Sequence, residues 1–229
     1  MTLNEMIFKR KSCRSVTNTP LDAEMIERIL SFELKPLYPE IKVRMDIVPR
    51  NQVKCICPWT TPQLITIYSE KADGYLENIG FLFQQMDLYL QTLGLGACWL
   101  GMGRMNPKTT TEVEGMKFVI MLAFGHPKGD QLRRDGKGFK RKPMEKITDK
   151  ADERLEVARL APSAVNSQPR YFTHEGDTIH VYCSRKGSRL DTGIALAHLY
   201  VSNEKSFHFF KADHDADLPG YGYIGSVNI

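Results

Sequence analysis

The hydrophobic positions along the chain follow two periods, which predict helices and strands. Spacings of three and four residues predict helices over 3–7, 22–32, 75–93 and 155–160. Alternating or continuous apolar runs predict strands over 43–47, 64–68 and 118–124. The helix over 75–93 is hydrophobic nearly all round, so it should be buried on every side, in the core and at a chain–chain interface. Helices and strands in this order predict an α+β fold, a mixed sheet flanked by helices.

The second part of the chain repeats the order of the first. Arg10-Lys11-Ser12 returns as Arg141-Lys142-Pro143, and the strand end Ile67-Tyr68 returns as Val181-Tyr182. We therefore predict two related halves, residues 1–135 and 136–229, joined near 129–138. Chance similarity between two α/β units is the alternative, because the repeat is offset by one residue at a glycine.

Composition allows a sizeable core, with 229 residues of which 42% are hydrophobic and 25% are charged. No apolar run approaches the roughly 18 residues that a membrane span needs, and residues 1–10 lack the apolar core of a signal peptide. We expect a soluble, cytoplasmic protein without a membrane partner. The net charge of +4 is small, and its densest region, 128–142, carries a single aromatic, Phe139. This favours a solvated loop over a nucleic-acid surface.

The five cysteines are an odd number without metal-site spacing. Cys55 and Cys57 would lie on one face of a strand, but no second pair and no nearby histidine completes a zinc set. We predict reduced, mostly structural thiols and no metal site.

The most informative segment is Ala161-Pro-Ser-Ala-Val-Asn-Ser-Gln-Pro-Arg-Tyr-Phe172. Pro162 would end the preceding helix, and Pro169 would open an extended run. Between them lie four short polar side chains, Ser163, Asn166, Ser167 and Gln168. Amides donate and accept in one plane, so such a turn can hold a flat polar heterocycle. An ordinary helix-to-strand connection is the alternative.

Two further segments have the composition of ligand-binding sites. Arg10-Lys11-Ser12-Cys13-Arg14 offers guanidinium, ammonium and hydroxyl donors to a phosphate, or simply caps a helix and meets solvent. Leu93-Gly-Leu-Gly-Ala-Cys-Trp-Leu-Gly-Met102 carries glycines that let backbone amides approach a ligand. A helix end followed by a buried strand is the alternative there.

Together these segments resemble the nitroreductase family of FMN-dependent oxidoreductases, which carries Arg-x-Ser-x-Arg, Gly-Leu-Gly-x-x-Trp-Ile-Gly and Ala-Pro-Ser-Ala-x-Asn-x-Gln-Pro-Trp. Gly125-His126-Pro127 and Arg141-Lys142-Pro143 match two further family segments. The resemblance implies a nitroreductase-like fold of a two-domain subgroup. It also implies FMN as the cofactor and NADH or NADPH as the electron donor. The acceptor would be a small molecule of the nitroaromatic or quinone type, reduced in a ping-pong cycle by a homodimer.

The resemblance also implies roles for individual residues. The flavin carries the chemistry, so no catalytic side chain is expected. The phosphate and ribityl chain would meet Arg10, Lys11, Ser12, Arg14 and Arg141. The flavin N5 would face Leu100, Gly101 and Met102. The ring side would be formed by Pro162, Ser163, Ala164, Asn166 and Gln168.

The sequence departs from the family at three points. Arg170 replaces a tryptophan and would either change the charge of the site or face outward, and Val16 replaces an aromatic residue. The Ala-Pro-Ser-Ala segment lies in the other half of the chain from Arg10. This order leaves open whether the flavin binds within one chain or across two. His126 is more often a turn residue than an acid or base at such a strand end.

Other functions share some of these segments. A flavoprotein of the same fold could dehalogenate a substrate or fragment a flavin, and a non-catalytic protein could bind FMN as a carrier or sensor. A nucleic-acid module is the least favoured alternative, because it would require a steep salt dependence of affinity.

Overall fold

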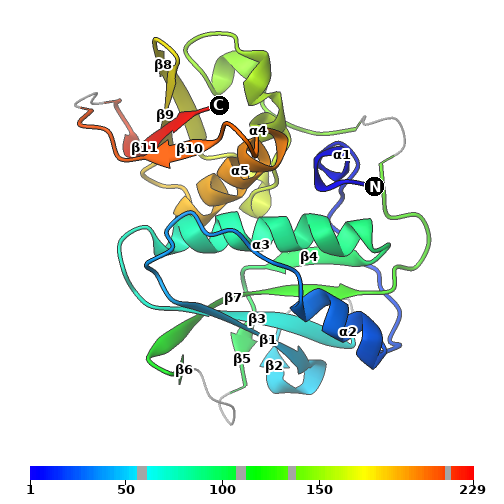
Figure 1. Ribbon diagram of the computed structural model, residues 1–229. Helices are drawn as coiled ribbons and strands as arrows, with labels where there is room; N and C mark the ends of the chain where they lie inside the picture. The colour runs from blue at the N-terminus through cyan, green and yellow to red at the C-terminus, as the bar shows by residue number, and fades with distance from the viewer. Residues whose placement is uncertain (56–60, 107–111, 134–137, 215–217) are drawn as a thin grey trace. The chain divides into compact units, whose positions relative to one another are not determined.

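The computed structural model describes residues 1–55, 61–106, 112–133, 138–214 and 218–229 (Figure 1). The chain forms two compact units, and both are discontinuous in sequence. The first contains Met1–Tyr75 and Met86–Lys137, and the second contains Leu76–Gln85 and Gly138–Ile229. The predicted boundary between residues 135 and 136 lies outside the described residues. Cys57 and part of the basic region over 128–142 lie outside them as well.

The first unit contains an antiparallel sheet in the order β1-β3-β7-β4, with β6 also paired to β7. Two short strands, β2 and β5, form a separate ladder. All three predicted strands are present, and each is two or three residues longer than predicted. The bounds are β1 Val43–Pro49, β2 Val53–Lys54, β3 Gln63–Ser69, β4 Gly96–Leu100, β5 Arg104–Met105, β6 Glu112–Val113 and β7 Met116–Gly125.

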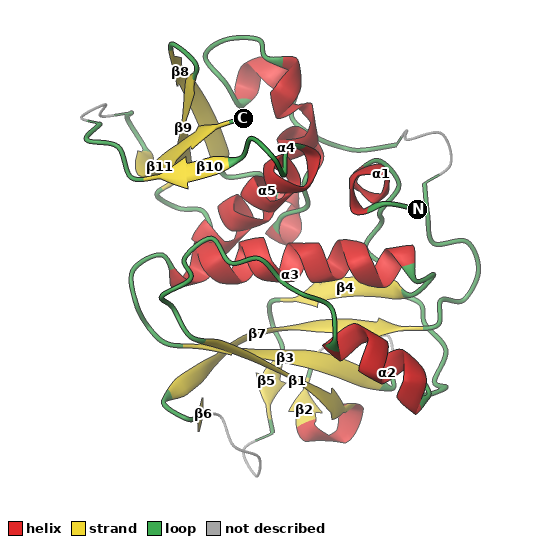
Figure 2. Ribbon diagram, viewed as in Figure 1, coloured by secondary structure: helices red, strands yellow, loops and turns green. Residues whose placement is uncertain are grey.

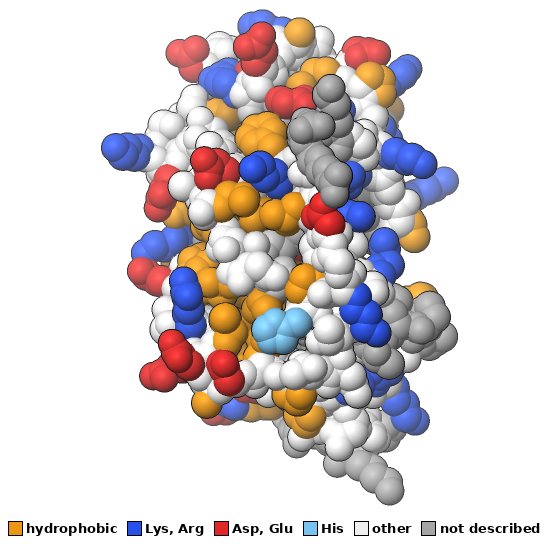
Figure 3. Space-filling view, turned by 90° about the vertical axis from the view of Figure 1, so that its right-hand side faces the viewer, with side chains coloured by type: hydrophobic (Ala, Val, Ile, Leu, Met, Phe, Trp, Pro, Cys, Tyr) orange, Lys and Arg blue, Asp and Glu red, His pale blue; other side chains and the backbone are white. Residues whose placement is uncertain are grey.

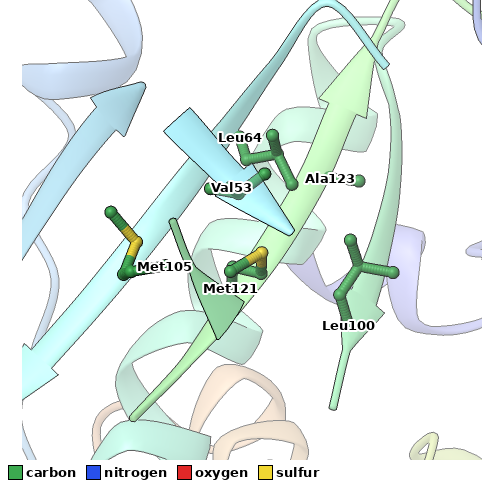
Figure 4. Packing of buried hydrophobic residues seen from close by; sticks show 6 residues of the cluster. All are labelled: Val53, Leu64, Leu100, Met105, Met121 and Ala123. Atoms are coloured by element: carbon green, nitrogen blue, oxygen red, sulfur yellow. The ribbon is translucent and has the colours of Figure 1, made fainter. Parts of the chain in front are cut away.

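Apolar side chains from both ladders of the first unit pack in one cluster (Figure 4). Val53 and Met105 come from the short ladder, and the larger sheet contributes the others. Strand β3 is buried along its whole length, as a continuous apolar strand between neighbours should be. The cluster is Val53, Leu64, Leu100, Met105, Met121 and Ala123.

Helix α3, Tyr75–Thr92, matches the predicted helix over 75–93 and has Gly94 in the left-handed region directly after its end. Its side chains are buried almost throughout within a single chain, including polar ones such as Glu77, Gln84 and Asp87. The helix is therefore buried within one chain, and the predicted chain–chain interface stays a prediction. Polar side chains on a buried helix require partners, and these partners bear on the candidate site.

The other helices of the first unit are short and begin with side-chain caps. Helix α1, Leu3–Ile7, starts with a capping box between Thr2 and Glu5. Helix α2, Ala23–Leu30, is capped by Asp22, whose carboxylate accepts a hydrogen bond from the Met25 N–H at 2.8 Å. Both helices lie where the apolar spacing predicts them.

The second unit contains a four-stranded antiparallel sheet in the order β10-β11-β9-β8 together with helices α4 and α5 (Figure 2). Helix α4 is preceded by one 3₁₀ turn over Glu153–Leu155, so the predicted helix over 155–160 is present. The bounds are α4 Glu156–Leu160, β8 Arg170–Glu175, β9 Thr178–Ser184, α5 Arg189–Ser202, β10 His208–Phe210 and β11 Tyr221–Asn228.

The first half of α3 belongs to the second unit, where it lies against α5. A Cβ atom built on Gly80 would lie 2.1 Å from the Leu190 carbonyl oxygen, and one on Gly193 would lie 2.1 Å from that of Glu77. Only glycine permits backbones to approach this closely. Glu77 and Arg189 form an ion pair beside this contact.

None of the described helices is both long enough and apolar enough to cross a membrane. On the face shown in Figure 3, Lys, Arg, Asp and Glu side chains occupy scattered positions, with hydrophobic side chains exposed between them.

Candidate functional site

The Arg10–Arg14 segment lies along the edge of β4. Ser12 forms a parallel bridge with Ala97, and the Cys13 N–H donates to the Ala97 carbonyl at 2.9 Å. A Cβ atom on Gly96 would lie 2.4 Å from Cys13 Sγ, so the glycine is what allows this approach. The segment is thereby fixed on the sheet.

The cations of this segment have different environments. The Arg10 side chain is 2% exposed, and its Nε lies 2.8 Å from Oδ2 of the fully buried Asp87. This contact is an ion pair without hydrogen-bond geometry at Nε, whereas Nη2 donates to Ser12 Oγ at 3.3 Å. Lys11 and Arg14 are exposed. Arg10 is therefore held by the protein itself, and the other two cations face solvent.

Helix α3 supports the segment through two polar residues one turn apart. Gln91 accepts a hydrogen bond from the Lys11 N–H at 3.0 Å and donates to Asp87 at 3.2 Å. The sequence analysis missed both residues. The detectable signal was two polar residues at the i, i+4 spacing on an otherwise apolar helix.

Leu100, Gly101 and Met102 lie where β4 ends. Leu100 belongs to the apolar cluster, and the next two residues form an exposed turn, with Met102 68% exposed. Arg104 Nη1 donates to the carbonyls of Gly101 and Gly103, at 3.3 and 2.8 Å, and this closes the turn. A strand rises about 3.3 Å per residue, so Gly101 lies about 13 Å along β4 from the pairing of Ser12 with Ala97.

In the second unit, the Ala161–Phe172 segment forms a turn of unusual backbone conformation. Val165, Asn166 and Gln168 have φ angles of 46°, 58° and 49°. Asparagine tolerates this left-handed region, but a β-branched valine there is strained by about 1–3 kcal/mol. Val165 is also fully exposed, and Ala164 and Asn166 are exposed beside it. Such strain persists only where surrounding contacts impose it.

Those contacts come from three directions. Both carboxylate oxygens of Asp191, on α5, accept from the Ala164 N–H at 3.1 Å. Ser163 Oγ accepts from the Gln168 N–H at 2.9 Å. Gln168, which is buried, accepts from the Lys142 N–H through Oε1 at 2.8 Å and from Lys142 Nζ through its carbonyl at 2.9 Å. Pro162 is buried at the start of the turn.

The side chain of Arg141 contacts this turn as well. Its Nε donates to the Leu160 carbonyl at 3.1 Å and its Nη1 donates to Asn166 Oδ1 at 2.8 Å. Asn166 Nδ2 in turn donates to the Lys140 carbonyl at 2.8 Å. The structure thus brings Arg141 together with the predicted ring-side residues of the second unit. Its predicted contact with the phosphate stays a prediction.

Arg170 is buried, 1% exposed, so the alternative that it faces outward is wrong. Its Nη2 donates to the carbonyls of Arg159 and Ala161, both at 2.9 Å, and this caps the end of α4. Burial, and to a smaller extent nearby Arg141, lower the pKa of Arg170 to about 9. Burial likewise raises the pKa of Asp191 to about 6, against the opposing effects of the Ala164 N–H and Arg170.

His126 is exposed and follows β7 directly. Its backbone carbonyl accepts a hydrogen bond from the Thr17 N–H at 2.7 Å. This placement agrees with a turn residue.

A family model described as "Putative TM nitroreductase" matches residues 2–203. A solved structure of a nitroreductase-type protein from Thermotoga maritima has 20% identity and a TM-score of 0.68, and the match covers 99% of this chain and 92% of that one. At this identity the likeness shows the fold, which is nitroreductase-like as predicted. No protein of curated function matches the chain.

Two Clostridium difficile structures are more distant. A nitroreductase family protein from strain 630 has 16% identity and a TM-score of 0.49, and the match covers 64% of this chain and 96% of that one. An FMN-dependent nitroreductase from strain R20291 has 17% identity and a TM-score of 0.45, with 56% and 91% covered.

Proposed function

The chain belongs to the "Putative TM nitroreductase" family, and from this we propose that it is an FMN-dependent oxidoreductase that uses NADH or NADPH to reduce a small acceptor. The observation that carries the proposal is the turn at Ala161–Gln168. Its strained, exposed backbone is imposed by Asp191, Lys142 and Arg141 at the position of the family's ring-side motif. Strain maintained in this way is typical of ligand sites.

The Arg10–Arg14 segment on the edge of β4 would bind the phosphate. Exposed Lys11 and Arg14 would meet the phosphate, with Ser12 as a neutral donor, because charge-assisted bonds from such groups suit a phosphate monoester. Arg10 would add a guanidinium held in place by Asp87. Pre-orientation by a buried carboxylate reduces the entropy lost when a ligand binds.

Residues Leu100–Met102 would lie beside the flavin N5, and the polar groups of Pro162–Gln168 beside the ring. When bound, a flavin supplies hydride transfer, and the protein supplies position and exclusion of water. In this protein the exposed Met102 would flank the face on which the nicotinamide and then the acceptor bind in turn. Asn166 would offer its second amide hydrogen and second oxygen lone pair to the ring, since Arg141 and Lys140 use one of each.

The test is cofactor content followed by turnover. We expect purified protein to be yellow, to release FMN on denaturation, and to oxidise NADH or NADPH when a quinone or nitroaromatic is supplied. Asn166→Leu should lose FMN while it stays folded, and Ser167→Ala, on the neighbouring exposed residue, should retain it. Tight FMN without reduction by either nicotinamide would instead identify a non-catalytic binder, and full FMN retention in Asn166→Leu would reject the ring contact.

A homodimer remains part of the proposal on the basis of the family resemblance alone. Light scattering on dilute, FMN-loaded protein should give twice the chain mass of 26.1 kDa. A monomer mass would reject the dimer without affecting the assignment of the cofactor.

A further inference from the structure

One face of the sheet in the second unit is polar. His180 on β9 is paired with Thr173 on β8 and with Ser226 on β11. Because side chains alternate along a strand, Glu175 and Tyr182 lie on the same face as Thr173 and His180. The opposite face carries the buried apolar side chains of Ile179, Val181 and Cys183.

His214, which follows β10, lies over His180 on this polar face. The ring centroids of His180 and His214 are 3.5 Å apart and the ring planes differ by 12°. His180 is 3% exposed. Two imidazoles stacked at this distance and largely shielded from water would repel each other if both were charged.

A carboxylate lies next to both rings. Glu175 Oε2 is 3.2 Å from His180 Nε2 and 3.9 Å from His214 Nδ1. One nitrogen from each ring and this oxygen all lie within 4.8 Å of one another. The three ligand atoms are therefore close together. Because the two rings are nearly parallel and an imidazole lone pair lies in the ring plane, His214 must turn out of the stack for both nitrogens to face one ion.

In each ring, the nitrogen that does not face Glu175, here called the outer nitrogen, is hydrogen-bonded to a hydroxyl. His180 Nδ1 lies 2.7 Å from Ser226 Oγ, and His214 Nε2 lies 2.5 Å from Tyr182 Oη. Ser226 is itself bonded to Tyr223 Oη at 2.6 Å. A hydroxyl that accepts the outer N–H leaves the inner nitrogen with its lone pair toward Glu175. Metal-binding histidines are oriented in this way.

We propose that Glu175, His180 and His214 bind a divalent transition-metal ion of the Zn²⁺ type. Two imidazoles and one carboxylate are ligands that zinc accepts, and three protein ligands leave one coordination position for water or a small ligand. Metal–ligand bonds of about 2.0–2.1 Å in a tetrahedron require ligand atoms about 3.4 Å apart. The Glu175 side chain is 75% exposed, so it can move to close the remaining distance.

A nearby histidine shows the opposite arrangement. His174 contacts two separate carboxylates, Asp149 through Nδ1 at 2.7 Å and Asp152 through Nε2 at 3.2 Å. Both of its nitrogens are occupied on different sides of the ring, so its ligands diverge. Bound metal at the proposed site would instead join His214 to the β8–β9 hairpin, and would therefore stabilise the second unit.

The experiment is calorimetric titration of the untagged, full-length protein with Zn²⁺, together with Co²⁺ absorption spectra and thermal unfolding. We expect one Zn²⁺ per chain, a visible Co²⁺ spectrum of low coordination number, and a higher melting temperature with Zn²⁺. Glu175→Gln should weaken binding at least about ten-fold, and Ser226→Ala about 10–100-fold through the outer hydrogen bond. His214→Asn should abolish binding.

His208→Asn, on an exposed histidine of β10, is the matched control and should bind Zn²⁺ as the unchanged protein does. Absence of Zn²⁺ binding by the unchanged protein would overturn the proposal. Equal affinities in the unchanged protein and Glu175→Gln would overturn it too. Because Glu175 is exposed, Glu175→Gln should fold even if His214→Asn does not. The Zn²⁺ affinity of Glu175→Gln therefore tests the proposal without the other variants.

Discussion

Arg10 and Arg14 belong to one predicted phosphate segment, but because one is buried and the other is exposed, their substitutions should affect stability differently. Arg14 is exposed, so Arg14→Ala should weaken FMN binding about ten-fold or more without loss of stability, because a charge-assisted bond is worth about 1.5–3 kcal/mol. Arg10→Ala should also weaken FMN binding, and it would break a buried ion pair with Asp87 at a cost of about 3–5 kcal/mol. FMN titration and urea unfolding of both variants measure the two effects separately.

The double variant Arg10→Ala/Asp87→Ala provides the control. It should recover part of the lost stability, because the carboxylate that loses its Arg10 partner is removed as well, but it should not recover FMN affinity. If Arg14→Ala and Arg10→Ala both retain FMN fully, the segment has no part in the cofactor site.

Asp191 links the stability of the second unit to pH. Burial raises its pKa from 3.8 to about 6, so between these values the folded chain holds a proton that the unfolded chain has released. The contribution of this group to the free energy of unfolding should therefore be complete below pH 4 and should be lost as pH rises to 6, a fall on the order of 3 kcal/mol. Asp191→Asn should lack this fall. Urea unfolding at several pH values between 4 and 7 measures the difference.

Asp177→Asn, in an exposed turn, serves as the comparison and should keep the pH dependence of the unchanged protein. An Asp191→Asn profile that parallels the unchanged protein from pH 4 to 6 would show that the carboxyl is not perturbed in the folded state.

The sequence revealed the cations and amides of the candidate site but not their partners. Arg10, Asn166 and Gln168 stand out because a motif surrounds them. Asp87, Gln91 and Asp191 lie far away in sequence, and only the packing of α3 and α5 brings them to these segments. Arg170 could not be placed either, because capping of α4 depends on carbonyls that are exposed only once the helix ends.

At the scale of elements, the turn at Ala164–Asn166 stores strain that a substitution can release. Glycine adopts positive φ at no steric cost, and Val165 is fully exposed, so Val165→Gly loses no buried contacts. The release of about 1–3 kcal/mol of strain exceeds the entropic cost of glycine, about 0.5–1 kcal/mol. We therefore expect Val165→Gly to raise the free energy of unfolding by about 1 kcal/mol in urea titrations. Val165→Ala should give a smaller gain, and a loss of stability in Val165→Gly would mean that the turn is not strained.

Regular elements were predictable where one period dominates. The helix over 75–93 and the strand over 118–124 differ from α3 and β7 by only a few residues, because their apolar patterns are long. The left-handed turn was not predictable in its conformation, since valine is among the residues least suited to it. Contacts from Asp191 and Lys142 override the local preference there.

At the scale of the whole molecule, one helix is shared by the two units. Residues Leu76–Gln85 of α3 belong with the second unit, and the helix continues from Met86 within the first. The prediction of two consecutive halves did not include a helix shared in this way. Hydrophobic spacing identifies a helix but not the unit in which each of its turns is buried. A helix is cooperative along its length, so damage to its first half should reach the second.

Gly80→Ala tests this coupling. The added methyl group would meet the Leu190 carbonyl at 2.1 Å, so α3 and α5 must separate, at a cost of about 1–3 kcal/mol. Trp99, in β4, belongs to the first unit, and its fluorescence therefore reports on that unit. We expect tryptophan fluorescence and far-ultraviolet circular dichroism to shift together to lower urea concentration in Gly80→Ala. Gly222→Ala, whose methyl group would meet its nearest neighbour at 4.0 Å, should leave both unchanged. A fluorescence transition that stays in place while part of the dichroism signal shifts would mean that the units unfold independently.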